Sequence, residues 1–326
     1  MQVLQPIREV YQGLDVPDLL IGLDSPDDAA VWRLGDGRAL VMTTDFFTPV
    51  VDDPYDYGAI SAANSLSDIY AMGGTPFAAL SIAALPPNLD ISLSQRMMQG
   101  LAEKTLESGT VIVGGHTIDD KEPKIGLVVL GFAEEDHLIR KDGLQLGDQL
   151  VLTKPLGFGV TTTALKRQEA PPEDIQEAVD WMKQLNRGAA QLATQFAVKA
   201  GTDITGFSLL GHAWEMALGA GVGLKLNYQD IPLISCAHKH AQAWRFPGGA
   251  FDNQTYYQSN VVFDPGITEA QQLLLFDPQT SGGLLLGVPT SRIDAFMKAA
   301  QDQHQPAWVI GEVIQEPKIK VKNNKH

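Results

Sequence analysis

The sequence predicts an α+β protein built from two mixed domains, and three observations lead to this expectation. The chain has 326 residues, about twice the length of a typical domain. Segments with strand patterns and segments with helix patterns alternate in both halves. A connection at residues 143–147, with glycine at both ends, separates the halves. We therefore expect an N-terminal domain at 1–146 and a C-terminal domain at 147–326.

In the first half, apolar runs bounded by glycine, proline and acidic turns predict strands, and segments rich in alanine and serine predict helices. The pair Ser92 and Gln95 has the spacing of a capping box at the start of a helix. The expected elements are, in order, strands at 29–34 and 39–44, a helix at 57–72, a strand at 77–84, a helix at 92–109, and strands at 110–113 and 125–133.

The second half has the same mixed character, which favours a second α/β unit rather than an all-helical one. Residues 318–326 are basic and short, and we expect them to be frayed. The expected elements are a strand at 149–153, a turn at 154–157, helical stretches within 173–199, a helix at 208–219, and strands at 223–226 and 283–288.

Composition restricts the class of function. The formal net charge of −15 disfavours an extended surface for nucleic acid or anionic lipid. The longest apolar runs, such as 125–133, are too short to span a bilayer, so no membrane segment is expected. The single cysteine, Cys236, cannot form an internal disulfide, and the first residues do not resemble a signal peptide, which together favour the cytoplasm.

Carboxylates at element ends are the candidates for chemistry. Asp27 and Asp28 lie in a turn, Asp45 closes an expected strand, Asp68 lies on an expected helix, and Asp203 lies in a glycine-bounded segment. Dispersed aspartates of this kind suit Mg²⁺, which binds hard oxygen ligands and bridges them to phosphate. Two structural alternatives stay open: strand-end aspartates also cap backbone N–H groups, and the face carrying Asp68 also fits a solvated helix surface.

Other phosphate or metal sites have weaker support. No P-loop and no Gly-x-Gly-x-x-Gly pattern occurs. The glycine turns at 114–117 and 157–160 could each present backbone N–H groups to phosphate, although ordinary tight turns have the same composition. Zinc is disfavoured, because His238 and His240 beside Cys236 lack the spacing of a zinc site.

Taken together, these segments resemble selenophosphate synthetase, of the aminoimidazole ribonucleotide synthetase-like ATP-binding superfamily. The resemblance extends over nearly the whole chain and is carried by segments in a matching order. They are DDAAV at 27–31, TTDFFTPVVDDPYDYG at 43–58, AANSLSDIYAMGG at 62–74, GGH at 114–116, LTKPLG at 152–157, TDITGF at 202–207 and DPQTSGGL at 277–284.

The resemblance implies a homodimer whose N-terminal domain forms the dimer and the ATP site. It also implies an ATP-dependent kinase reaction of selenide and water that yields selenophosphate, AMP and phosphate. Three aspartates are implied as magnesium ligands: Asp28, Asp68 and Asp203. The implied nucleotide contacts are Ser25, Pro26, Asp27, Asp45, Asp68, Gly115, His116 and Thr117.

One family feature is not found in this sequence. The family carries a reactive Cys or selenocysteine and an essential Lys before its first helix, whereas here the only cysteine is Cys236 and the first lysine is Lys104. The catalytic residue is therefore unknown. A shortened chain, a divergent paralogue and a start assigned downstream of a selenocysteine codon all remain open. The alternatives in function are a nucleotide-binding scaffold dimer without turnover and a related kinase or synthetase with another acceptor.

Overall fold

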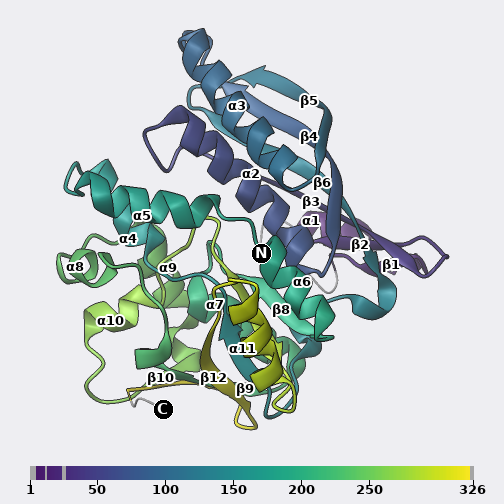
Figure 1. The fold of residues 1–326 in the computed structure, drawn as a ribbon, viewed down its shortest axis with the longest axis vertical. Coiled ribbons are helices and arrows are strands. Elements are labelled where there is room, and N and C mark those ends of the chain that lie inside the picture. Colours follow the sequence, from purple (N-terminus) through teal and green to yellow (C-terminus); the bar gives the residue numbers. More distant parts are fainter. Residues whose placement is uncertain (1–4, 12, 24–26, 324–326) are drawn as a thin grey trace.

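The computed structural model describes residues 5–11, 13–23 and 27–323. Two mixed sheets, each accompanied by helices, form the upper and lower parts of the molecule in Figure 1. This arrangement confirms the predicted fold of two mixed α/β units. In the described part of the chain, no helix is both long and apolar enough to cross a bilayer.

The first sheet has the strand order β1-β2-β3-β6-β4-β5. Its neighbouring strands are antiparallel except for the parallel pair β4 and β5. The elements of this half are α1 (Gln5–Tyr11), β1 (Leu19–Ile21), β2 (Ala30–Arg33), β3 (Arg38–Phe47), α2 (Pro54–Ala71), β4 (Thr75–Leu85), α3 (Ile91–Glu107), β5 (Val111–Asp119) and β6 (Lys124–Glu134).

The second sheet has the order β10-β13-β9-β12-β7-β11-β8, with helices on both of its faces. Its elements are β7 (Gln149–Leu152), α4 (Phe158–Lys166), α5 (Pro172–Lys183), α6 (Arg187–Gln195), β8 (Ala200–Asp203), α7 (Ser208–Ala220), β9 (Gly223–Asn227), α8 (Ala237–Gln242), α9 (Gly248–Tyr257), β10 (Val261–Phe263), α10 (Glu269–Leu274), β11 (Leu284–Val288), α11 (Ile293–Asp302), β12 (Trp308–Ile314) and β13 (Ile319–Lys322).

Helix α2 joins the two halves of the molecule. It begins at Pro54, after Asp53 accepts a hydrogen bond from the N–H of Asp56 at 2.9 Å. Its neighbour α3 approaches very closely, because a Cβ at Gly58 would lie 1.9 Å from the carbonyl oxygen of Met97. Apolar residues of α2 belong to both core clusters, each of which also contains residues of the second sheet. The interface between the halves is therefore part of the hydrophobic core.

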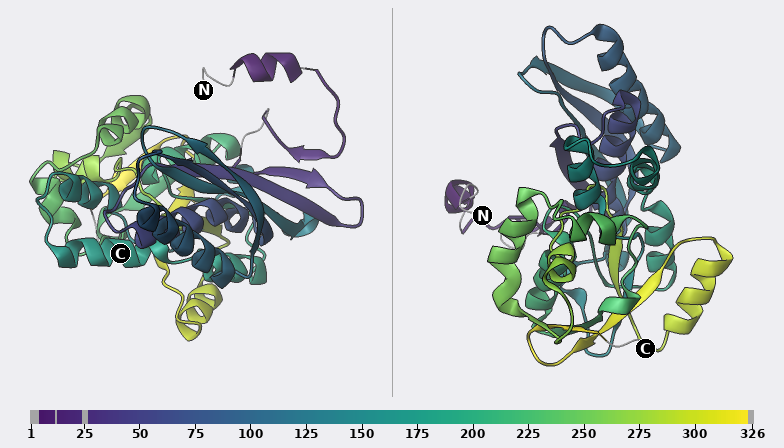
Figure 2. Two further views of the ribbon diagram at one scale, coloured as in Figure 1. Left: turned by 90° about the horizontal axis from the view of Figure 1, so that it is seen from above. Right: turned by 90° about the vertical axis from the view of Figure 1, so that its left-hand side faces the viewer.

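Helix α1 differs from the rest of the first half. It has no buried residue, and both views in Figure 2 show it apart from the main body of the molecule. The packing that positions the candidate site therefore comes from the two sheets and the helices between them.

Two local predictions were wrong, and a third is refined. The N-cap residue of α3 is Asp90, whose side chain accepts from the N–H of Ser92 at 2.8 Å. The capping box predicted for Ser92 and Gln95 therefore does not form. The tail is not frayed over 319–322, because β13 pairs with both β9 and β10. The helical stretches predicted within 173–199 are confirmed, and they form α5 and α6, separated by residues 184–186.

Candidate functional site

A strand and a helix bring the first two predicted carboxylates together. Thr43 and Asp45 point to the same side of β3 because they are two residues apart, and Asn64 and Asp68 share one face of α2 because they are four apart. Two residues along a strand and four residues along a helix each span about 6 Å, so Asn64 can lie opposite Asp45 while Asp68 lies opposite Thr43. Asn64 Nδ2 donates to Asp45 Oδ2, and Thr43 Oγ1 donates to Asp68 Oδ2. The polar face of α2 therefore packs on the sheet instead of facing solvent.

The position of Asp45 corrects one expectation. It does not close its strand, because β3 continues to Phe47 and Asp45 pairs with Leu127 of β6. Its backbone carbonyl accepts from Ser65 Oγ at 2.9 Å. Burial raises the pKa of the Asp45 carboxyl, and the Asn64 hydrogen bond opposes that rise.

The second half of the chain contributes Asp203, which ends β8 and is 2% exposed. Its neighbour Thr202 donates through Oγ1 to Asp28 Oδ1 at 2.8 Å, so the turn before β2 meets β8 here. Asp27 accepts from the backbone N–H of Lys141 at 3.0 Å and from that of Asp28 at 2.9 Å. The acidic turn of the first half is thus joined to two segments of the second sheet region.

The carboxylates are close enough to oppose one another's ionisation. Burial, followed by the charges of Asp203 and Asp28, raises the pKa of Asp68 well above its ordinary value. Burial and the charge of Asp28 raise the pKa of Asp203 to about 6, and the same two causes raise that of Asp27 to about 6. Such a cluster requires positive charge to be ionised at neutral pH.

One lysine supplies part of that charge. Lys141 Nζ lies 2.9 Å from Asp28 Oδ1 and 3.4 Å from Glu215 Oε2. Burial opposes the Lys141 ammonium, but the charges of Asp28 and Glu215 outweigh it and raise the pKa of Lys141. Glu215 also faces His212, whose Nδ1 lies 3.6 Å from Glu215 Oε2.

The donor set fits Mg²⁺. Two buried carboxylate oxygens, Asp28 Oδ2 and Asp203 Oδ2, have no hydrogen-bond partner within the described residues. Unpartnered carboxylate oxygens are costly unless a cation or water satisfies them, and hard oxygens are the ligands Mg²⁺ prefers. The oxygens of Asp28, Asp68 and Asp203 do not form a compact group within 4.8 Å, so the set suits ions that are completed by water and phosphate.

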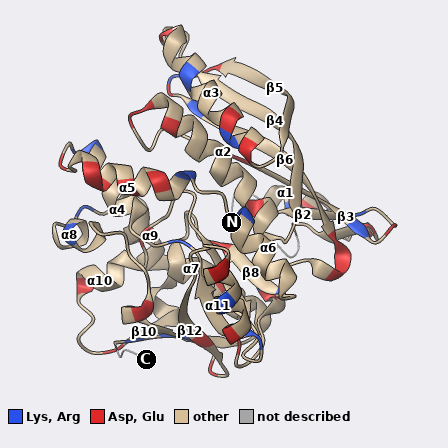
Figure 3. Ribbon diagram, in the orientation of Figure 1, with Lys and Arg blue, Asp and Glu red and all other residues tan. Residues whose placement is uncertain are grey.

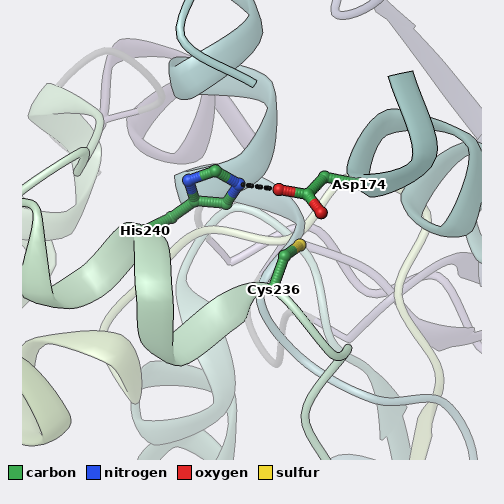
Figure 4. Close-up of side chains that lie close together, drawn as sticks. All are labelled: Asp174, Cys236 and His240. Carbon is green, nitrogen blue, oxygen red and sulfur yellow. Dashed lines mark ion pairs between the residues drawn. The ribbon is translucent and has the colours of Figure 1, made fainter. Parts of the chain in front are cut away.

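A different trio does form such a compact group. Asp174, Cys236 and His240 are the one set of three in the described part of the chain whose ligand atoms lie within 4.8 Å of one another (Figure 4). The sequence interpretation missed it, because Asp174 is remote along the chain.

Neighbouring charges and the contact with Arg245 give this group a structural character. His240 Nε2 lies 2.9 Å from Asp174 Oδ2, and Arg245 Nη1 lies 2.9 Å from His240 Nδ1. Since a guanidinium can only donate, Nδ1 must accept, and the ring proton lies on Nε2, the atom a metal would need. Lys239 adds a second cation, 3.0 Å from Asp174 Oδ2. Burial raises the pKa of the Cys236 thiol, which keeps it protonated.

The glycine segment expected as a turn at 114–117 is a strand. Gly115, His116 and Thr117 lie within β5 and pair in parallel with β4. Asp45 pairs with Leu127 of β6, Leu127 pairs with Ser81 of β4, and Ser81 pairs with Gly115. Gly115 is therefore three strand spacings from Asp45, roughly 14 Å. These three predicted nucleotide contacts are exposed and are not brought to the carboxylates within one chain.

The second glycine turn is already capped. Gln279 Oε1 accepts from the N–H groups of Gly157 and Phe158, both at 3.0 Å, and Asp277 Oδ2 accepts from that of Val160 at 3.1 Å. These three N–H groups at the N-terminus of α4 are therefore hydrogen-bonded to side chains and are not free to bind phosphate. Ser25 and Pro26, also predicted as nucleotide contacts, lie outside the described residues.

Sequence reasoning missed several residues that complete the site. Lys141 and Thr202 flank the carboxylates, and Asn186 Nδ2 donates to Ser67 Oγ at 2.8 Å and to the carbonyl of Gly282 at 2.9 Å. Thr202 was adjacent to a candidate and could have been included for that reason. Lys141 and Asn186 follow no local pattern.

In the orientation of Figure 3, basic and acidic residues of the described chain are interspersed. Acidic segments occur on many helices and loops in Figure 3, and basic segments are scattered between them.

Two family models match the chain. "AIR synthase related protein, N-terminal domain" matches residues 26–133, and "AIR synthase related protein, C-terminal domain" matches residues 145–323. The chain is 45% identical over 297 residues to "Selenide, water dikinase 2" of Peptoclostridium acidaminophilum, covering 91% of this chain and 85% of that protein. It is 44% identical over 310 residues to "Selenide, water dikinase" of Pelobacter propionicus, covering 94% and 89%.

Solved structures share the fold at low sequence identity. Thiamine monophosphate kinase from Aquifex aeolicus has a TM-score of 0.69 and 19% identity, with 100% of this chain and 98% of that chain covered. The hydrogenase maturation protein HypE in complex with ATP has a TM-score of 0.69 and 18% identity, with coverages of 95% and 86%. These likenesses establish the architecture of two mixed sheets.

Proposed function

Because the chain belongs to the selenide, water dikinase family of AIR synthase related proteins, we propose that it uses ATP to make selenophosphate from selenide and water. The other products would be AMP and phosphate. The observation that carries the proposal is that Asp28, Asp68 and Asp203 lie near one another at the junction of the two sheets. Within the described residues, one buried oxygen of Asp28 and one of Asp203 have no hydrogen-bond partner.

The proposed site holds magnesium through these carboxylates. Bound Mg²⁺ would neutralise the triphosphate and align it, which is the main requirement of phosphoryl transfer. Asp28, Asp68 and Asp203 would be its ligands. Asp45 and Asp27 would lie against the nucleotide, and Lys141 would balance charge beside Asp28. A protein with a net charge of −15 needs this local positive charge to bind ATP.

A homodimer is part of the proposal. The face of the first sheet opposite α2 exposes apolar side chains on three of its strands, β3, β4 and β5. Phe46 is 49% exposed, Leu80 40% and Ile118 52%. Residue alternation and strand pairing place them on that face. A second copy could cover it, and Gly115–Thr117 on β5 belong to the same end of the sheet.

The proposal also covers the location of the protein and the two alternative functions. A cytoplasmic location is consistent with a single cysteine, Cys236, which is buried and unpaired. A scaffold without turnover and an enzyme with another acceptor are not favoured, because relatives at 38–45% identity over about nine-tenths of the chain share one enzyme name.

The proposal is tested by following ATP and selenide with ³¹P NMR under anaerobic conditions. The protein should be expressed from its reading frame together with any coding sequence upstream of Met1. We expect selenide-dependent formation of selenophosphate and AMP in equal amounts. Asp68→Asn should lower the rate on the order of 100-fold or more, because it removes a proposed ligand of the magnesium that would stabilise the negative charge of the phosphates. Asp302→Asn, an exposed aspartate of α11, is the matched control.

A further inference from the structure

Lys154 is a buried lysine that the proposed reaction does not use. It follows β7, is 1% exposed, and donates from Nζ to the backbone carbonyl of Ser281 at 2.7 Å. Within the described residues, no carboxylate oxygen lies within 4.0 Å of its Nζ, although Asp203 is near enough to favour its charge. Burial lowers the pKa of Lys154 to about 7. Such a buried amine needs a specific role to offset its desolvation.

The surrounding backbone fixes the place of this lysine. Leu284 donates from its N–H to Thr153 Oγ1 at 2.7 Å, and the N–H of Thr153 donates to the carbonyl of Leu284 at 3.1 Å. A Cβ on Gly283 would lie 2.3 Å from the backbone nitrogen of Lys154. The two segments are therefore packed closely together, and Ser281, whose carbonyl accepts from Lys154, lies two residues before Gly283.

The Ser281 peptide is held in an unusual conformation. Ser281 is fully buried and has φ +52°, in the left-handed region that side chains other than glycine rarely adopt. Its carbonyl accepts from Lys154, and its N–H donates to Asn64 Oδ1 at 2.8 Å. The lysine thus holds one side of a residue whose other side contacts the first half of the chain.

The contact with Ser281 determines which way the Asn64 amide points. With Oδ1 turned to the Ser281 N–H, Nδ2 faces Asp45 and donates to its Oδ2. The reverse orientation would set two N–H groups against each other and an amide oxygen against a carboxylate. Asn64 is 6% exposed, so water cannot easily replace either partner.

We propose that Lys154 is a positioning residue: it fixes the Ser281 peptide, which orients the Asn64 amide and thereby the carboxylate of Asp45. The relay crosses from the second sheet region to the first, so the C-terminal half sets the geometry of a carboxylate in the N-terminal half. Only the role of Asp45 in holding nucleotide rests on the proposed function.

The relay itself can be tested without nucleotide. The side-chain amide signals of Asn64, assigned by their loss in Asn64→Ala, are recorded by ¹⁵N NMR in the full chain. Lys154→Met should shift both signals, whereas Lys298→Met, which removes an exposed lysine, should not. Unchanged Asn64 signals in a folded Lys154→Met protein would overturn the proposal. If that variant does not fold, Lys154→Gln is used, and it should shift the same signals.

A double-mutant cycle tests the consequence for the nucleotide site. Binding of a non-hydrolysable ATP analogue with Mg²⁺ is measured by calorimetry. Lys154→Met should weaken it about tenfold, the effect of one hydrogen bond to a charged group. The double variant with Asn64→Ala should bind no more weakly than Asn64→Ala alone. Additive losses, or unchanged affinity in Lys154→Met, would contradict the relay. Failure of the unaltered protein to bind the analogue would contradict the proposed function, while the NMR result would still decide the relay.

Discussion

The ammonium of Lys141 lies 2.9 Å from Oδ1 of Asp28, so the chain itself supplies a cation at a carboxylate that we assign to magnesium. The Lys141 side chain is 15% exposed and that of Asp28 is 3% exposed, which makes this a largely desolvated pair. A divalent ion arriving at Asp28 must therefore compete with, or move, this lysine.

Lys141→Met should change two affinities in opposite directions. Without nucleotide, Mn²⁺ should bind about tenfold more tightly, because a competing positive charge is gone. The ATP analogue should bind more weakly, because the site loses charge that attracts phosphate. Paramagnetic resonance of Mn²⁺ and calorimetry measure the two effects, with Lys298→Met as control. Weaker Mn²⁺ binding in Lys141→Met would show that the lysine supports the metal site instead of competing with it.

Asp203 should make the metal-free protein less stable at neutral pH. Its pKa is about 6 in the folded chain against an ordinary 3.8, so the unfolded chain releases this proton first as pH rises. Stability should decline between about pH 4 and pH 6 and stay low above that range. Asp203→Asn should remove this loss and raise the free energy of unfolding at pH 7.5 by about 2 kcal/mol, while activity is lost.

Urea unfolding at several pH values, with and without Mg²⁺, measures this effect. Added Mg²⁺ should stabilise the unaltered protein at pH 7.5 and have less effect on the variant. A lower stability of Asp203→Asn at pH 7.5 in the absence of metal would refute this explanation.

Gln279→Ala tests whether the start of α4 is a cap or a phosphate site. The change leaves the buried N–H groups of Gly157 and Phe158 without their acceptor, so we expect a loss of about 2–3 kcal/mol in stability. The KM for ATP should stay within about twofold of the unaltered value, because we place no nucleotide contact at these donors. A tenfold change in KM without loss of stability would instead support phosphate binding there.

Leu80→Glu tests the proposed dimer. A charge on the exposed face of the first sheet should prevent a second copy from covering it, and light scattering should then report a monomer. Leu218→Glu places the same change on α7, at a side chain that is 66% exposed, and should leave the oligomeric state unaltered. Equal masses for Leu80→Glu and the unaltered protein would exclude this face as the interface.

The sequence predicted the two mixed units because periodicity is a local property, and it identified the aspartates because they stand in a characteristic order. It could not predict that Asp45 lies within a continuing strand, since the pairing of β3 with β6 is a tertiary feature. Glycines at 114–115 indicated a turn, yet both lie within β5, which pairs with β4, and the second is packed closely against Ser81.

Long-range partners were also beyond local patterns. Lys141 and Asn186 reach the site from segments whose sequence carries no distinguishing signal, and the acceptors that cap α4 come from more than a hundred residues away. Residues that complete a site across a domain junction are visible only once the two sheets are packed together.

The most direct test of the central claim is the product analysis of ATP consumption by the protein expressed with any upstream coding sequence. We predict that AMP and selenophosphate form together, that neither forms without selenide and Mg²⁺, and that Asp68→Asn lowers the rate of formation of both by about 100-fold or more. Formation of ADP as the final product, or ATP consumption at the same rate without selenide, would contradict the assignment.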